Sequence, residues 1–306
     1  MLSASRARPA VGALVVIALV ALAGCAAAPA RDRNDGPLAG DDLSQLGDGT
    51  IYLVAGPRPD RAELWRLDLA TGASTRLVRS AAGLGLSTVS ASPSGLVLGG
   101  SAAGVLSAGR LDGRGVTALG GGGVTDPAVN RKGRVAWLRP ADLDSPGGNR
   151  SAQVEVGDLD ETRPAVLFRG EGVRLAGAAW GPAGWLAVGS RVGKDARVLV
   201  FDRRGLLRGR LDARVHGAHG AVWGAHAPGV AVTGHRHSEV LGLDGSRQPI
   251  PDGWQPLCWR PDGKAMLVGR GTAVGLWRGQ AEVVAIPVRL GAVSSCSWLE
   301  QPAPDA

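Results

Sequence analysis

Four histidines gather in one short part of the sequence, and imidazole is a side chain well suited to bind a transition metal. His216 and His219 stand in the segment HGAHG, and His235 and His237 stand in the segment GHRH. Neutral imidazole binds Zn, Cu or Ni, and it also titrates near neutral pH. Because no HxxxH spacing or neighbouring carboxylate accompanies the four, the pattern leaves three readings open: a metal site, a pH-sensitive loop, or exposed loop histidines.

Cationic side chains recur in the turns between repeated apolar segments, and we expect these turns to share one face of the molecule. Guanidinium groups there could bind an anionic ligand or an acidic partner. Trp254, in the segment PDGWQP, is expected to be exposed on the same face as a partner anchor. The alternative is that exposed turns carry charge for solubility. The candidate face consists of Arg58, Arg61, Arg139, Arg150, Arg191, Lys194, Arg236, Trp254 and Arg270.

Sequence signatures of catalysis are missing. There is no G-x-S-x-G elbow, no H-E-x-x-H, no phosphate-binding loop and no G-x-G-x-x-G. Asp126 and Asp252 are the only acidic residues that we place on loops leading inward, and Asp126-Pro127 reads as an ordinary turn. We therefore expect no enzyme activity and no cofactor; a hydrolase or lactonase is the weaker alternative.

The first 24 residues, 1–24, have the pattern of an export signal. Arg6 and Arg8 precede the uncharged apolar run 10–23, which is too short to span a bilayer, since a helix needs about 20 residues. The segment Leu22-Ala23-Gly24-Cys25 resembles the bacterial lipobox. That resemblance implies cleavage before Cys25, lipidation of its thiol, and anchoring at the outer face of the cytoplasmic membrane, with an outer membrane as the alternative. An ordinary signal peptide with an incidental Cys is the alternative.

Composition divides the rest of the chain. Residues 25–48 are rich in Ala, Asp, Gly and Pro and predict a flexible tether after the lipidated Cys, residues 49–300 form the folded domain, and 301–306 are a disordered tail. Loss of Arg6 and Arg8 lowers the net charge from +7 to +5. No Lys/Arg cluster is interleaved with aromatic residues, so we expect no nucleic-acid binding.

A hairpin of two apolar strands around a Gly-containing turn recurs through the folded domain. Its turn glycines are 38, 51, 45 and 34 residues apart, which is the spacing of propeller blades. These glycines are Gly95, Gly133, Gly184, Gly229 and Gly263. Because the first repeat lacks an innermost strand and the C-terminal segment 292–300 is a lone one, we predict an all-β, six-bladed propeller that the C-terminal strand closes. Five or seven blades are the alternatives.

The turns WRPDG (259–263) and WGPAG (180–184) resemble the W-S-P-D-G turn of TolB-like and WD40-like propellers, and SPSG (92–95) resembles it more loosely. TolB carries a second, N-terminal domain that we do not expect here. The actinobacterial LpqB lipoproteins join a lipobox to a similar propeller, although they contain further domains. The resemblance implies a bacterial, membrane-anchored, extracytoplasmic propeller for protein–protein interaction, with a sensor kinase as the partner that the likeness to LpqB suggests.

Two further cysteines occupy equivalent places in consecutive repeats. Cys258 and Cys296 each precede a recurring Trp. An oxidising compartment permits a disulfide between them, but we expect two buried free thiols. The favoured function is a non-catalytic, lipid-anchored scaffold that binds a protein partner. The alternative is a binding protein for a metal, a small anion or a cell-wall glycan.

Overall fold

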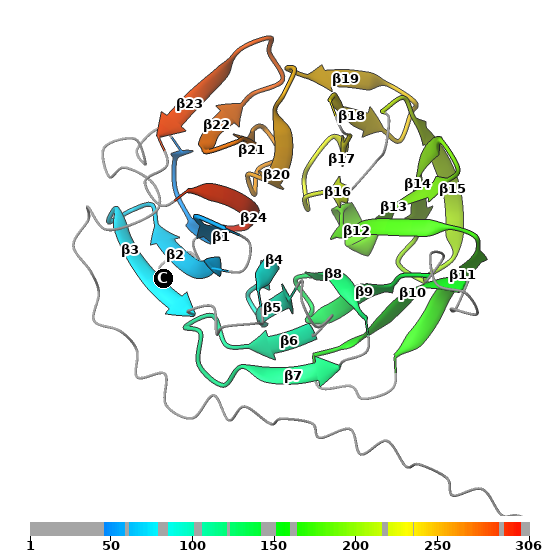
Figure 1. Ribbon diagram of the computed structural model, residues 1–306, viewed down its shortest axis with the longest axis horizontal. Helices are drawn as coiled ribbons and strands as arrows, with labels where there is room; N and C mark the ends of the chain where they lie inside the picture. Colours follow the sequence, from blue (N-terminus) through cyan, green and yellow to red (C-terminus); the bar gives the residue numbers. More distant parts are fainter. Residues whose placement is uncertain are drawn as a thin grey trace, which may run out of the picture.

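The chain forms a six-bladed β-propeller, as predicted. The computed structural model describes residues 46–58, 61–78, 85–100, 106–120, 123–141, 151–159, 164–215, 220–234, 236–287 and 291–300. Six four-stranded antiparallel sheets stand around a common axis, and no α-helix occurs among the described residues (Figure 1). Four of the predicted segments lie wholly or mostly outside these residues: the signal 1–24, Cys25, the tether 25–48 and the tail 301–306. Within the described part, no helix is long and apolar enough to cross a membrane.

Each blade runs from an innermost to an outermost strand. The innermost strands are β24 (Ala292–Leu299), β4 (Leu86–Ser92), β8 (Thr125–Val129), β12 (Arg174–Trp180), β16 (Gly220–Val222) and β20 (Gln255–Trp259). The second strands are β1 (Thr50–Gly56), β5 (Gly95–Gly100), β9 (Arg134–Arg139), β13 (Leu186–Val192), β17 (Gly229–Thr233) and β21 (Met266–Arg270).

The two outer strands of each blade complete the sheets. The third strands are β2 (Glu63–Asp68), β6 (Leu106–Gly109), β10 (Ser151–Asp158), β14 (Asp195–Phe201), β18 (Ser238–Gly242) and β22 (Ala273–Trp277). The outermost strands are β3 (Ala73–Val78), β7 (Thr117–Gly120), β11 (Ala165–Glu171), β15 (Leu207–Ala213), β19 (Arg247–Ile250) and β23 (Val283–Pro287).

The C-terminal strand closes the ring. Strand β24 pairs with β1 from Thr50 opposite Leu299 to Gly56 opposite Ala292, so the first blade is built from both ends of the folded domain. Cys258 of β20 and Cys296 of β24 form a disulfide across a Cα–Cα distance of 5.5 Å. Our expectation of free thiols was therefore wrong, because equivalent positions on adjacent innermost strands lie within bridging distance.

Side chains of the innermost strands join neighbouring blades. The indole N–H of Trp180 donates to the Ala128 carbonyl at 3.0 Å, and that of Trp259 donates to the Val222 carbonyl at 3.4 Å, each reaching the blade before its own. Ser297 of β24 accepts a hydrogen bond from the Ala91 N–H of β4 at 2.9 Å. Trp180 and Trp259 thus belong to the contacts between blades.

The repeated turn also packs between blades. Gly263, the glycine of WRPDG, has a φ of +71°, a conformation that L side chains rarely adopt. A Cβ at this position would collide with the backbone carbonyl of His226 in the preceding blade. Glycine is therefore required at this turn by both its backbone angle and its neighbour.

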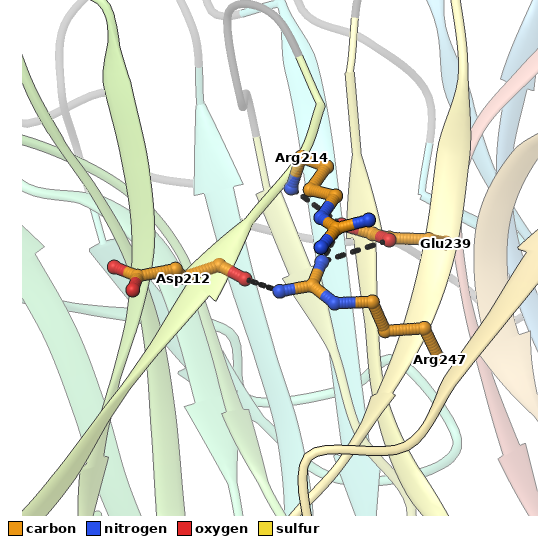
Figure 2. Close-up of polar contacts among 4 residues, drawn as sticks. All are labelled: Asp212, Arg214, Glu239 and Arg247. Atoms are coloured by element: carbon orange, nitrogen blue, oxygen red, sulfur yellow. Dashed lines mark hydrogen bonds and ion pairs between the residues drawn. The ribbon is translucent and has the colours of Figure 1, made fainter.

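We number the blades 1 to 6 in the order of their innermost strands β24, β4, β8, β12, β16 and β20. One buried carboxylate joins blades 4 and 5 near the rim (Figure 2). Glu239 of β18 accepts the backbone N–H of Arg214 at 2.7 Å and the guanidinium of Arg247 at 3.0 Å. Arg247 also donates to the backbone carbonyl of Asp212 in β15. These contacts fix the C-terminal end of β15 against the next blade, where the chain leaves β15 for β16.

A candidate binding site at the basic end of the central channel

A hollow of about 2,020 Å³ runs along the axis of the propeller and is lined by the innermost strands of all six blades. Its two ends differ in the turns that surround them. At one end lie the turns that join first to second and third to fourth strands, and we call this the basic end. At the opposite end lie the turns that join second to third strands and the connections between blades.

The first turn of the basic end, residues 130–134, presents two cations. The Gly133 N–H donates to the Asn130 carbonyl at 3.0 Å, and the Asn130 side-chain oxygen accepts the N–H groups of Lys132 at 2.9 Å and Arg134 at 3.0 Å. This Asn-capped turn is a rigid element. Arg131 and Lys132 at its tip are exposed and line the hollow.

The second turn, residues 202–206, repeats this chemistry on the neighbouring blade. The Gly205 N–H donates to the Asp202 carbonyl at 2.8 Å, and the Asp202 carboxylate accepts the N–H groups of Arg204 at 2.8 Å and Leu206 at 3.1 Å. Arg208 donates to the same carboxylate at 2.7 Å. Burial acts to raise the pKa of Asp202, but the bonds from the Leu206 N–H, Arg208 and the Arg204 N–H outweigh it and lower the pKa.

The cations at the tips of these turns are largely free of acidic partners. Among the described residues, Lys132, Arg203 and Arg204 make no ion pair, and all three line the hollow. Arg131 lies 3.4 Å from Glu300, in a pair whose side chains are mostly exposed, so that pair contributes little. Two adjacent blades therefore hold a cluster of positive charge at one end of the hollow.

The predicted cationic face lies at the opposite end, and only Arg270 of its described members lines the hollow. The Arg270 guanidinium stacks over Trp254 at 4.7 Å from the ring centre. Trp254 is 6% exposed and packs in the core near Val283, so the prediction of an exposed anchor was wrong. The connection that carries Trp254 turns its ring into the blade beneath Arg270.

Arg139 is also engaged within the fold. Its guanidinium donates to the Glu155 carboxylate at 3.0 and 3.3 Å, and the indole N–H of Trp137 donates to the same carboxylate at 2.6 Å. Glu155 is buried, so Arg139 neutralises an internal charge, which contradicts its predicted place in a ligand face. Four other members of the face lie on turns of the opposite end: Arg58, Arg61, Lys194 and Arg236. Arg191 lies near the end of strand β13 beside them. None of these five lines the hollow, and Arg150 lies outside the described residues.

The histidine cluster falls mostly outside the described residues, which exclude His216, His219 and His235. His237 is described, and its Nδ1 lies 2.8 Å from an oxygen of Asp252, with both side chains largely exposed. No group of three or more metal-binding side chains occurs in the described ranges. The metal site stays a prediction.

Asp126 occupies a bulge of the innermost strand β8 rather than an ordinary turn. The pairing with β9 skips from Thr125 to Ala128, and Asp126 has a φ of +49°. It lines the hollow toward the opposite end. Burial raises its pKa, although hydrogen bonds from the Gly177 backbone and Thr125 act in the other direction. The two ends thus contain carboxyl groups whose pKa values are shifted in opposite directions.

Comparisons with known proteins support the fold. The structure of TolB from Acinetobacter baumannii matches with a TM-score of 0.65 and 14% identity over 83% of this chain and 67% of that one. The fold is a TolB-like propeller. A structure of the nidogen/laminin complex matches with a TM-score of 0.64 and 14% identity, over 84% of this chain and 100% of that one. No family model matches the sequence, and no curated protein is significantly similar to it.

The sequence contains a signal for the basic end that the predicted cationic face does not include. Both turns follow the order Asn or Asp, two cations, then Gly, as NRKG at 130–133 and DRRG at 202–205. An Asn or Asp followed three residues later by Gly indicates a capped tight turn, whose two central side chains point outward. The repetition of this pattern in adjacent blades of the TolB-like ring could have identified the site.

Proposed function

We propose that this chain is a non-catalytic scaffold, lipid-anchored through Cys25 at the extracytoplasmic face of a bacterial cytoplasmic membrane, whose basic end binds an acidic segment of a protein partner. The observation that carries the proposal is the cluster of Lys132, Arg203 and Arg204, which have no acidic partner among the described residues. The lipobox-like segment 22–25 supports the anchor.

The geometry of the two turns favours recognition of carboxylates. Guanidinium groups bind carboxylates through two parallel hydrogen bonds, which gives direction as well as charge attraction. Because Asn130 and Asp202 already fix the backbone of their turns, binding costs little ordering of the main chain. The positive end also steers an acidic partner toward the propeller. One similar structure is that of a complex of two proteins, nidogen and laminin, which agrees with a role in protein binding.

A small anion or an anionic cell-wall glycan is the second candidate ligand, because the same cations line a hollow of about 2,020 Å³. It would bind by the same charge attraction but would leave no protein adduct in a crosslinking experiment. This difference separates the two functions.

A photoreactive benzoylphenylalanine at single positions of the full-length protein tests the proposal in intact cells. Lys132 and Lys194 form a matched pair, since both are exposed lysines at hairpin tips, at the basic and opposite ends respectively. We expect a protein adduct from position 132 and none from position 194. An adduct from position 194 alone, or from neither, contradicts the proposal. Fatty-acid labelling is expected for the parent and absent from Cys25→Ser; an unlabelled parent contradicts the anchor.

A further inference from the structure

A second, smaller hollow of about 380 Å³ opens at the basic end, next to the second turn. It is lined by Ala183, Trp185, Asp202, Arg203, Arg204 and Arg208. Ala183, Arg203 and Arg204 line the central hollow as well, so the two spaces adjoin. Its volume lies within the range of about 300–1,000 Å³ that is typical of small-molecule sites.

The charges around the small hollow leave it positive. Asp202 is the only acidic residue among those that line it, and its carboxylate already accepts hydrogen bonds from Arg208 and from two backbone N–H groups. Arg203 and Arg204 make no ion pair among the described residues. Two guanidinium groups are therefore available to an incoming anion.

Apolar surface accompanies these charges. Trp185 is partly buried and packs against the core of blades 4 to 6, while one part of it lines the hollow. Leu206 and Leu207, which directly follow the second turn, are 51% and 39% exposed, although neither lines the hollow itself. The alkyl stems of the arginines add further apolar surface. An apolar wall next to free guanidinium groups suits a ligand with an apolar group flanked by negative charge.

We propose that the small hollow takes an apolar side chain of the partner, while the carboxylates that flank this side chain in the partner's sequence bind Arg203 and Arg204. The docking sequence is then an aromatic or aliphatic residue between Asp or Glu residues. An extended segment fits better than a compact ligand because the cations continue to Arg131 and Lys132 on the neighbouring blade. This inference rests on the proposed function and adds to it the sequence class that the basic end selects.

Ala183 offers a matched pair of variants at the rim of the hollow. It has a φ of +53°, in the left-handed region that Asn and Asp tolerate better than other non-glycine residues. Ala183→Asn and Ala183→Asp are therefore both expected to fold, and they differ by one negative charge. Circular dichroism and thermal unfolding of both variants verify this before binding is compared.

The experiment measures the fluorescence anisotropy of three labelled heptapeptides with the full-length protein. The first peptide has a central Phe between acidic residues, the second has Ser in place of Phe, and the third keeps Phe but has Gln in place of each acid. Burial of a Phe side chain predicts that the first binds at least about tenfold more tightly than the second. The third is expected to bind at least about tenfold more weakly than the first. Because the two variants place side chains of nearly equal size at the rim and differ by one negative charge, Ala183→Asp should bind the first peptide about tenfold more weakly than Ala183→Asn.

Each outcome separates this inference from the proposed function. Equal binding of the Phe and Ser peptides overturns the apolar hollow but leaves acidic binding at the basic end intact. No binding of either acidic peptide contradicts the proposed function itself. Equal loss in Ala183→Asn and Ala183→Asp also overturns the inference, because charge would then not matter at the rim. If inorganic phosphate at low millimolar concentration displaces both acidic peptides without a difference between Phe and Ser, the site belongs to a small anion instead.

Discussion

Both ends of the central channel contain cationic side chains, but the contacts of these side chains differ. At the opposite end, Arg139 neutralises the buried Glu155 and Arg270 covers the ring of Trp254. At the basic end, Asn130 and Asp202 hold the backbone, and the guanidinium groups of Arg203 and Arg204 are left without acidic partners in the described chain. Arg191 and Lys194 at the opposite end also make no ion pair among the described residues, but they lie outside the lining of the hollow. A binding charge therefore differs from a structural one in two respects: it has no acidic partner, and it lines the hollow.

The carboxyl groups of the two ends show the same contrast. Asp126 is buried with too few hydrogen bonds to offset its desolvation, so its pKa is raised. Asp202 accepts bonds from two backbone N–H groups and Arg208, so its pKa is lowered. The opposite end thus contains a poorly stabilised carboxylate, Asp126, in the lining of the hollow. The basic end contains a well-stabilised carboxylate, Asp202, whose hydrogen bonds hold the backbone of the second turn.

The disulfide holds the ring that carries both ends, and its loss gives the largest expected effect. Cys258→Ala/Cys296→Ala should lower the free energy of unfolding by about 4 kcal/mol, given a separation of 38 residues. The affinity for an acidic peptide should stay within about twofold, since neither turn of the basic end contacts the bridge. Urea denaturation measures the first quantity and anisotropy the second. Reductant added to the parent should reproduce the loss and should leave the double variant unchanged; equal stability of parent and variant contradicts the prediction.

Removal of Glu155 should have the next largest effect. Glu155→Ala leaves Arg139 and the Trp137 N–H without their acceptor, and we expect a loss of about 3 kcal/mol in the free energy of unfolding. Arg203→Ala/Arg204→Ala should change it by about 1 kcal/mol or less, because each side chain is exposed. Glu155→Gln, which keeps an acceptor for Trp137, should cost less than Glu155→Ala. Equal losses in the free energy of unfolding for Glu155→Ala and Arg203→Ala/Arg204→Ala would contradict the distinction between structural and binding charges.

The smallest predicted effect is the pH dependence of stability at Asp126. Folding raises the pKa of Asp126, so this carboxyl group contributes to the stability of the fold at low pH. That contribution is lost as the pH rises through the folded pKa. Asp126→Asn, which also tolerates a φ of +49°, should therefore be more stable than the parent at pH 7 and equal to it near pH 3. Thermal unfolding across this range measures the difference.

Asp202→Asn is the control from the basic end, with the opposite sign. Folding lowers the pKa of Asp202, so in the parent this carboxylate contributes to the stability of the fold above the unfolded pKa. That contribution is lost as the pH falls through the folded pKa. Asp202→Asn should lack this loss and should be less stable than the parent at pH 7. Parallel pH profiles for the two variants would show that the carboxyl groups have similar environments, contrary to the structure.

The fold could be predicted from the sequence because its signal is periodic. The turn glycines from Gly95 to Gly263 mark successive blades, and the unpaired C-terminal strand predicts closure on the first blade, which the pairing of β24 with β1 confirms. Such patterns depend on local turn chemistry and on the alternation of strands, which a single sequence contains.

The site could not be predicted in the same way, because charge partners come from contacts distant in sequence. Trp137, Arg139 and Glu155 meet across two strands separated by a long connection, so Arg139 reads as a free turn residue until that register is known. Trp254 reads as exposed because its burial depends on Arg270 and Val283, two contacts within its blade that the local segment PDGWQP does not reveal. The repeated turns at 130–133 and 202–205 are visible in the sequence, but their shared end becomes evident only once strand order is fixed.

The central claim is that the basic end, and not the opposite end, binds acidic ligands. Fluorescence anisotropy of a labelled oligoglutamate at 0.15 M salt tests it with two variants of equal charge change, Arg203→Glu/Arg204→Glu and Arg191→Glu/Lys194→Glu. At this ionic strength screening acts within about 8 Å, so remote charges contribute little. We predict that the first variant binds at least about tenfold more weakly than the parent and that the second stays within about threefold. Equal losses in the two variants, or a larger loss at Arg191 and Lys194, would contradict the account.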